Sequence, residues 1–150
     1  MIALCAITQI VALIVVGFVS DGLVRHLVQT SPSWVVAGVA LNQTRWAKWI
    51  ALPVFVFWLV IMVLIWLYLL GIARILTGHY SDIEIAMTVV VGAASVLGIL
   101  TCAITRTGTR LWAAALLFII AAAIQVGAMS LSLRPQVSSD TGFSNWLHGA

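Results

Sequence analysis

Apolar residues fill four long stretches of this chain, and polar residues gather in the connections between them. The longest stretch, residues 50–73, contains no charged residue and no Ser, Thr, Asn or Gln. About 20 apolar residues in a helix cross a hydrocarbon core about 30 Å thick. The pattern therefore predicts helical membrane spans at about residues 2–20, 49–76, 85–105 and 111–133. Helices are expected because lipid offers the backbone no hydrogen-bond partners, and the alternation typical of barrel strands is absent.

The connections predict how the four spans are arranged. Ser81 and Glu84 match a capping box, which marks a helix start. The polar turn at 105–110 is short and contains a glycine, as expected where the last two spans form a tight antiparallel hairpin. The connection at 21–48 is expected to be a loop with a break at Pro32 and, after it, a short helix that includes residues 34–41 and lies at the interface or against the bundle. Residues 134–150 are expected to form a short tail. The predicted fold is one domain, an all-α, up-down, four-helix transmembrane bundle.

Composition and charge support membrane insertion and suggest an orientation. The chain is 63% hydrophobic and 7% charged, with a mean hydropathy of +1.19, whereas soluble domains are about 25% charged. Four spans place both termini on one side. The first and third connections hold more Lys and Arg than that side does, so we expect them in the cytoplasm and both termini outside. The basic residues predicted to be cytoplasmic are Arg25, Arg45, Lys48, Arg106 and Arg110. Six arginines against one lysine favour a bacterial, GC-rich genome, and the uncharged N-terminal segment suits an inner-membrane protein.

Two glutamines stand out because a polar side chain within a span is costly without a partner. Gln9 and Gln125 lie at similar predicted depths in the first and last spans. We expect an interhelical amide pair there, worth about 0.6–2 kcal/mol. The functional alternative is a polar spot on a solute path.

Side-chain size predicts two kinds of helix surface. Small residues in the last two spans are expected to form the seam inside the bundle, because close backbone approach favours association in lipid. These residues are Gly92, Ala94, Ser95, Gly98, Ala123 and Gly127. The span at 49–76 is bulky all round and is expected to face lipid or another subunit. Its exposed residues are expected to include Phe55, Trp58, Met62 and Trp66.

Candidate chemistry is sparse. Every Asp, Glu, Lys, Arg and His falls at or beyond the end of a predicted span, which argues against an ion pathway and against catalysis within the membrane. His79, Asp82 and Glu84 are weak candidates for a metal site, since capping and helix-terminus charge already account for the two carboxylates. No catalytic residue, cofactor, metal or nucleic-acid partner is expected.

Three functional hypotheses remain open on the sequence. The leading one is a non-catalytic accessory or structural subunit of a larger membrane complex, in contact with lipid and with other subunits. The alternative is a lipid-, quinone- or small-solute-handling membrane protein or transporter that acts as an oligomer. The third is a membrane enzyme that uses His79 with Asp82 or Glu84 at the outer surface.

Overall fold

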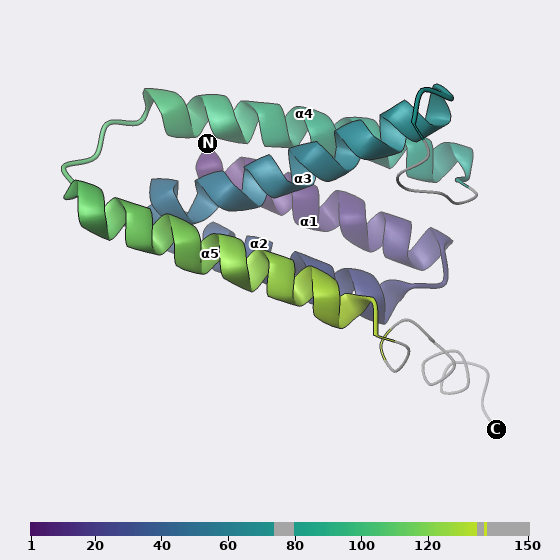
Figure 1. The fold of residues 1–150 in the computed structure, drawn as a ribbon, viewed down its shortest axis with the longest axis horizontal. Helices are drawn as coiled ribbons and strands as arrows, with labels where there is room; N and C mark the ends of the chain where they lie inside the picture. The colour runs from purple at the N-terminus through teal and green to yellow at the C-terminus, as the bar shows by residue number, and fades with distance from the viewer. Residues whose placement is uncertain (74–79, 135–136, 138–150) are drawn as a thin grey trace.

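The chain folds into five helices that run alternately up and down a common long axis (Figure 1). The structure is a computed structural model that describes residues 1–73, 80–134 and 137. No strand occurs in that part of the chain. All helices except α2 are long and apolar enough to cross a membrane, as the sequence predicts. The helices are α1 (Ile2–Val19), α2 (Leu23–Leu41), α3 (Ala47–Leu69), α4 (Asp82–Ile104) and α5 (Leu111–Ser132).

The fifth helix, α2, occupies most of the segment predicted to be a loop, and the break expected at Pro32 is absent. Proline has no N–H to donate to the carbonyl four residues earlier, which here is that of Val28. The Ser31 hydroxyl donates to this Val28 oxygen instead, at 2.8 Å. Within an apolar bundle such a side-chain donor replaces the missing backbone hydrogen bond, so the helix continues through the proline.

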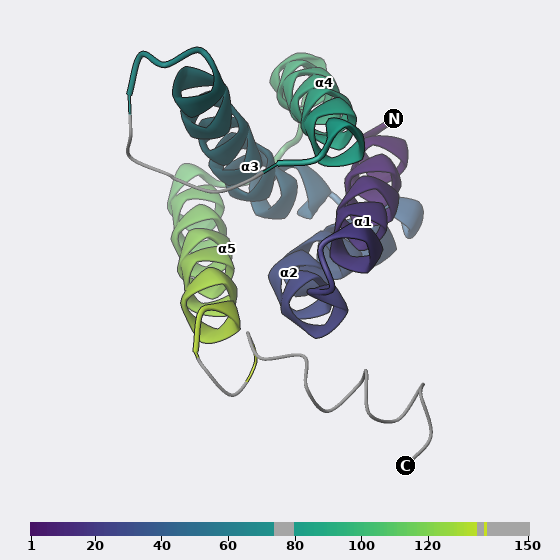
Figure 2. The ribbon, with the colours of Figure 1, turned by 90° about the vertical axis from the view of Figure 1, so that its right-hand side faces the viewer.

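Viewed along their length, the helices form a closed ring in the order α1, α2, α5, α3, α4 (Figure 2). The predicted tight hairpin between the last two helices is wrong, because α4 and α5 pack on different sides of α3 and do not contact each other. Both ends of the connecting segment, Thr105 and Arg110, have extended backbone. Six residues in that conformation can span about 20 Å, which is enough to carry the chain past α3.

The extra helix also changes where the helical part of the chain begins and ends. α1 begins at one end of the bundle and α5 ends at the other (Figure 1). We call the end that holds the start of α1 the basic end, because it carries Arg45, Lys48, Arg106 and Arg110. The opposite end carries Asp21, Asp82 and Glu84, and we call it the acidic end. Arg25 was predicted to lie on the same side as these four basic residues, but it lies at the acidic end.

Local sequence sets where α3 ends and α4 begins. Gly71 has a φ of 72°, the left-handed conformation that glycine adopts at low cost. This stops α3 at Leu69, several residues before the predicted end of the span. At the start of α4, the Ser81 hydroxyl accepts a hydrogen bond from the Glu84 N–H, and the Glu84 carboxylate accepts one from the Ser81 N–H. The predicted capping box is thus confirmed.

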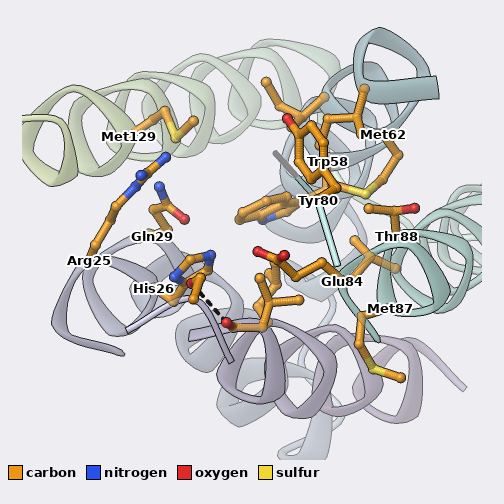
Figure 3. A pocket seen from close by; sticks show the side chains of 16 residues that line it. Arg25, His26, Gln29, Trp58, Met62, Tyr80, Glu84, Met87, Thr88 and Met129 are labelled. Carbon is orange, nitrogen blue, oxygen red and sulfur yellow. Dashed lines mark hydrogen bonds between the residues drawn. The ribbon is translucent and has the colours of Figure 1, made fainter. Parts of the chain in front are cut away.

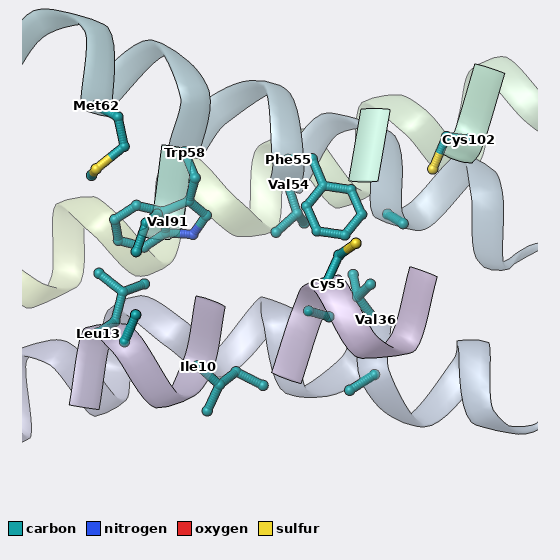
Figure 4. Packing of buried hydrophobic residues seen from close by; sticks show 14 of the residues in the cluster. Cys5, Ile10, Leu13, Val36, Val54, Phe55, Trp58, Met62, Val91 and Cys102 are labelled. Carbon is teal, nitrogen blue, oxygen red and sulfur yellow. The ribbon is translucent and has the colours of Figure 1, made fainter. Parts of the chain in front are cut away.

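The half of the bundle nearer the basic end is filled by apolar side chains from four helices (Figure 4). We call this set the apolar layer: Cys5, Val36, Val54, Phe55 and Cys102, each no more than 4% exposed. Phe55 fits because α4 presents Gly98 to it. A Cβ atom at Gly98 would lie 2.6 Å from the Phe55 ring, far inside van der Waals contact.

The bulky face of α3 therefore points mostly inward, contrary to expectation. Phe55, Trp58 and Met62 are 0%, 2% and 4% exposed, and of the four residues expected outside only Trp66, at 42%, lies at the surface. The physical reason is complementarity between helices. The small side chains of α4 leave room that the large side chains of α3 occupy, so size on one helix alone does not decide which face is buried.

The predicted small-residue seam forms on α4 but not on α5. Ala94, Ser95 and Gly98 are buried, and Gly92 approaches Met62. Ala123 and Gly127 instead lie on the exposed face of α5, and nothing lies within 4 Å of a Cβ built at Gly127. Since α4 and α5 do not meet, the two sets of small residues cannot pack against each other.

Candidate ligand cavity

A cavity of about 340 Å³ lies inside the helical ring, in the half nearer the acidic end (Figure 3). This volume falls at the lower end of the range typical of small-molecule sites. All five helices contribute side chains to its wall. The polar lining residues are Ser20, Arg25, His26, Gln29, Tyr80, Glu84 and Thr88. The apolar ones are Leu13, Val16, Trp58, Ile61, Met62, Ile65, Met87, Val91 and Met129.

The mouth of the cavity carries charged and titratable groups on opposite walls. Arg25 and His26 come from the first turn of α2, and Glu84 comes from the first turn of α4 (Figure 3). Local hydrogen bonds orient two of them. One carboxylate oxygen of Glu84 accepts from the Ser81 N–H at 2.7 Å and from its hydroxyl at 2.9 Å. His26 Nδ1 lies 2.9 Å from the Gly22 carbonyl oxygen.

Tyr80 adds a hydrogen-bond donor to the mouth. Burial raises the pKa of its phenol, the neighbouring Tyr68 and Glu84 raise it further, and the positive charge of Arg25 opposes them. The pKa is therefore above the ordinary value near 10, and the phenol keeps its proton at neutral pH. It can donate to an oxygen placed in the cavity.

The deeper wall contains an indole whose polar edge is unsatisfied. Trp58 is 2% exposed, and its Nε1 has no hydrogen-bond partner in the described part of the chain. The Nε of Arg25, which lies nearer the mouth of the cavity, is also buried and has no hydrogen-bond partner among the described residues. A buried N–H without an acceptor costs about 1–3 kcal/mol, so such groups in a native protein generally meet a water or a ligand.

Two other polar residues of the cavity wall, Gln29 and Thr88, have hydrogen-bond partners within the protein. The Gln29 amide donates to the Ser132 hydroxyl at 3.1 Å and links α2 to α5. Trp66 Nε1 donates to Thr88 Oγ1 at 2.9 Å, and Thr88 donates in turn to the Ile85 carbonyl oxygen at 2.7 Å. These bonds fix the wall of the cavity, whereas Trp58 Nε1 and Arg25 Nε have no acceptor among the described residues.

The cavity reaches the surface at the acidic end, where Ser20 is exposed. In the other direction it ends at the apolar layer, which fills the ring between Trp58 and the basic end (Figure 4). The arrangement is a pocket closed at one end, which suits binding more directly than passage through the bundle.

The predicted Gln9–Gln125 amide pair does not form. Gln9 donates through Nε2 to the Ser95 hydroxyl at 2.7 Å, while α1 and α5 are not in contact. The reason is that α2 lies between α1 and α5 in the ring (Figure 2). Gln125 is fully buried on α5, and neither polar atom of its amide has a partner in the described residues.

The structure adds no support to the metal site considered at His79, Asp82 and Glu84. His79 lies outside the described residues, Asp82 is exposed, and Glu84 lines the cavity. In the described part of the chain, no three His, Cys, Asp or Glu side chains group as metal ligands. Sequence reasoning missed His26 and Gln29 as site residues because it assigned their segment to a loop. The available signal was the spacing of polar residues 26, 29, 30 and 33, which share one face of a helix.

A scan of protein-family models and searches of curated proteins and of solved structures found no match to this chain. The fold and the cavity nevertheless define a class: an all-helical bundle with four helices apolar enough to cross a membrane and an internal pocket lined by residues of all five helices.

Proposed function

We propose that this chain is a multi-pass membrane protein that binds a small amphipathic molecule in the cavity of its helical ring. One observation carries the proposal. The cavity is apolar in its depth and polar at its mouth, and Trp58 and Arg25 present buried N–H groups to it that no described residue satisfies. Pockets of this kind, mostly apolar with a few convergent polar groups, are typical of small-molecule sites.

The same geometry removes the main support for an accessory subunit. That hypothesis rested on a bulky outer surface of α3, but Phe55, Trp58 and Met62 lie inside the bundle. The alternative hypothesis, a lipid-, quinone- or small-solute-handling membrane protein, needs an internal site with polar groups. The cavity supplies one.

The two faces of α2 support a fifth membrane crossing. Its exposed side chains are mainly apolar and include Trp34, Val35 and Leu41, which are 53%, 55% and 64% exposed. Its buried side chains include the polar residues His26, Gln29, Thr30 and Ser33. A helix of a water-soluble protein shows the reverse pattern. An apolar solvent around the bundle accounts for both faces, since polar groups in a membrane turn toward the bundle interior.

The distribution of charge supports an orientation with the basic end in the cytoplasm. Among the described residues this end carries four Lys and Arg side chains and no acidic one, against Arg25 and Arg134 at the acidic end. Aromatic rings accompany the charges, with Arg45 4.7 Å from the Trp46 ring centre and Lys48 5.0 Å from that of Trp49. Such aromatic and basic residues are typical of a cytoplasmic membrane interface. In this orientation the cavity opens to the non-cytoplasmic side.

The binding function is tested by filling the cavity. The protein is extracted in mild detergent, and bound small molecules are measured by native mass spectrometry and by solvent extraction. Val91→Phe places a ring in the cavity wall, and Val90→Phe makes the same change on the outer face of α4, where Val90 is 36% exposed. We expect bound amphiphile on the wild type and on Val90→Phe, and at least a tenfold lower occupancy on Val91→Phe.

Two results would contradict the binding proposal. One is equal occupancy of the two valine variants. The other is a wild-type protein that carries no small molecule and binds neither added fatty acid nor added quinone analogue. Met129→Trp provides a second cavity-filling variant from α5 if Val91→Phe does not fold.

The fifth crossing is tested by cysteine labelling with a membrane-impermeant thiol reagent. The native Cys5 and Cys102 are buried and give little background. Asp21→Cys and Gln43→Cys lie just outside the two ends of α2. If α2 crosses, the reagent labels them from opposite sides of the membrane. Labelling of both cysteines from the same side would show that α2 does not cross the membrane and would leave four crossings.

A further inference from the structure

We infer that the ligand of this cavity carries a flat ring with carbonyl oxygens, as a prenylated quinone does. The inference rests on the proposed binding function and specifies the chemical class of its ligand. Three features of the cavity carry it: the hydrogen-bonding groups left without partners, the side chains that surround them, and the balance of charge at the mouth.

The unpartnered groups of the cavity wall are donors. Trp58 Nε1 and Arg25 Nε are N–H groups, and both are buried without an acceptor in the described residues. An indole N–H can only donate, and so can a guanidinium. A ligand that satisfies them must therefore bring acceptor oxygens. Tyr80, protonated at neutral pH, adds a third donor at the mouth.

The surrounding side chains fit a flat conjugated ring. The indole of Trp58 forms part of the wall (Figure 3), and all three methionines that follow Met1 in the sequence, Met62, Met87 and Met129, line the same cavity. Thioether sulfur makes favourable contacts with aromatic rings, and the flexible methionine side chain adapts to the shape of what it contacts. A saturated acyl chain would gain little from this concentration of methionine.

Charge at the mouth favours a neutral head group. Arg25 on α2 and Glu84 on α4 are the only described Asp, Glu, Lys or Arg residues that line the cavity, and their formal charges cancel. His26 also lines the mouth beside Arg25. A carboxylate head would meet Glu84 as well as Arg25, whereas a carbonyl accepts from Arg25 and Trp58 without adding a like charge next to Glu84.

The test measures binding to the full chain in lipid nanodiscs by titration calorimetry. The probes are a short-chain ubiquinone analogue, an alkylbenzene with the same chain and no carbonyl groups, and decanoate. Trp58→Phe removes the indole N–H but keeps an aromatic ring. Arg25→Lys keeps the charge but removes the Nε–H. Trp34→Phe is the matched control, because Trp34 lies on the outer face of α2.

We expect the quinone analogue to bind the wild type at least tenfold more tightly than the alkylbenzene or decanoate. Loss of one hydrogen bond in a buried site corresponds to about a tenfold rise in Kd. Trp58→Phe and Arg25→Lys should each show about that rise for the quinone and almost none for the alkylbenzene. Trp34→Phe should leave both affinities within twofold of the wild type.

The outcomes separate this inference from the proposed function. If the alkylbenzene binds as tightly as the quinone, or if both variants bind the quinone like Trp34→Phe, the carbonyl ligand is wrong while the cavity still binds amphiphiles. Tighter binding of decanoate would replace the quinone with a carboxylate lipid. If none of the three probes binds the wild type, the quinone inference fails, and the occupancy measurement on the Val91 and Val90 variants then decides separately whether the cavity binds any amphiphile.

Discussion

The two halves of the bundle interior share the helices α1 to α4 but differ in how they are packed. Toward the basic end, the apolar layer fills the ring, and Phe55 is fully buried against Gly98. Toward the acidic end, flexible methionines and polar groups surround an open cavity. The difference teaches that one half is closed by packing, whereas the same helices leave a space between their side chains in the other. The other half contains the cavity in which we propose that a ligand binds.

The largest effect on stability is expected from removing a side chain of the apolar layer. Phe55→Ala removes a fully buried aromatic ring and should lower the free energy of unfolding by about 3–5 kcal/mol, because a cavity replaces the lost contacts. Denaturant titration in detergent, followed by helical circular dichroism, measures the change. Phe18→Ala is the matched control, since Phe18 is 63% exposed. Similar losses from the two variants would show that the apolar layer is not the more tightly packed region.

Overpacking the same half should cost somewhat less. Gly98→Ala places a Cβ atom 2.6 Å from the Phe55 ring, and relief of this overlap should cost about 1–3 kcal/mol. Gly92→Ala is the control on the same helix, where the new Cβ would be 3.9 Å from Met62, an ordinary contact. It should be neutral or stabilising, because alanine favours the helix over glycine. The unfolding midpoints of the two variants should therefore shift in opposite directions, or only that of Gly98→Ala should fall.

This pair of glycines also shows what the sequence reveals and what it hides. Four helices are predictable because each is apolar on every side over a sufficient length. The partner of a given helix face is not predictable in this way. Gly98 and Phe55 lie 43 positions apart, and only their contact across α3 and α4 explains why a bulky helix is buried. The same limit led to a predicted α4–α5 seam that does not exist.

The candidate site was hidden for a related reason. Its mouth depends on α2, whose polar residues His26, Gln29 and Ser33 face inward and lower the hydropathy of a segment that also contains Pro32. A search for apolar runs passes over such a helix, although its polar residues follow helical spacing. The cavity itself combines side chains from five helices, and the order of those helices around the ring follows from packing rather than from any local pattern.

A smaller effect is expected at the polar contact near the boundary between the two halves. Ser95→Ala removes the acceptor of the Gln9 amide, whose other polar atom, Oε1, is already without a partner in the described residues. A fully buried amide with no partner should cost about 1–2 kcal/mol. Adding Gln9→Leu should recover most of that loss, because the two groups are then both apolar. A double variant no more stable than Ser95→Ala would show that Gln9 has another partner.

The smallest effect on stability is expected in the open half, from Met129→Ala. Met129 is only partly buried and borders a space that is already empty of protein atoms, so its truncation creates little new cavity. It should lower the free energy of unfolding by less than about 1 kcal/mol. Its effect should appear instead when ligand is present. A bound quinone analogue raises the unfolding midpoint of the wild type, and this increase should shrink in Met129→Ala. A stability loss as large as that of Phe55→Ala would mean that the two halves are packed alike and would remove the contrast on which the binding site rests.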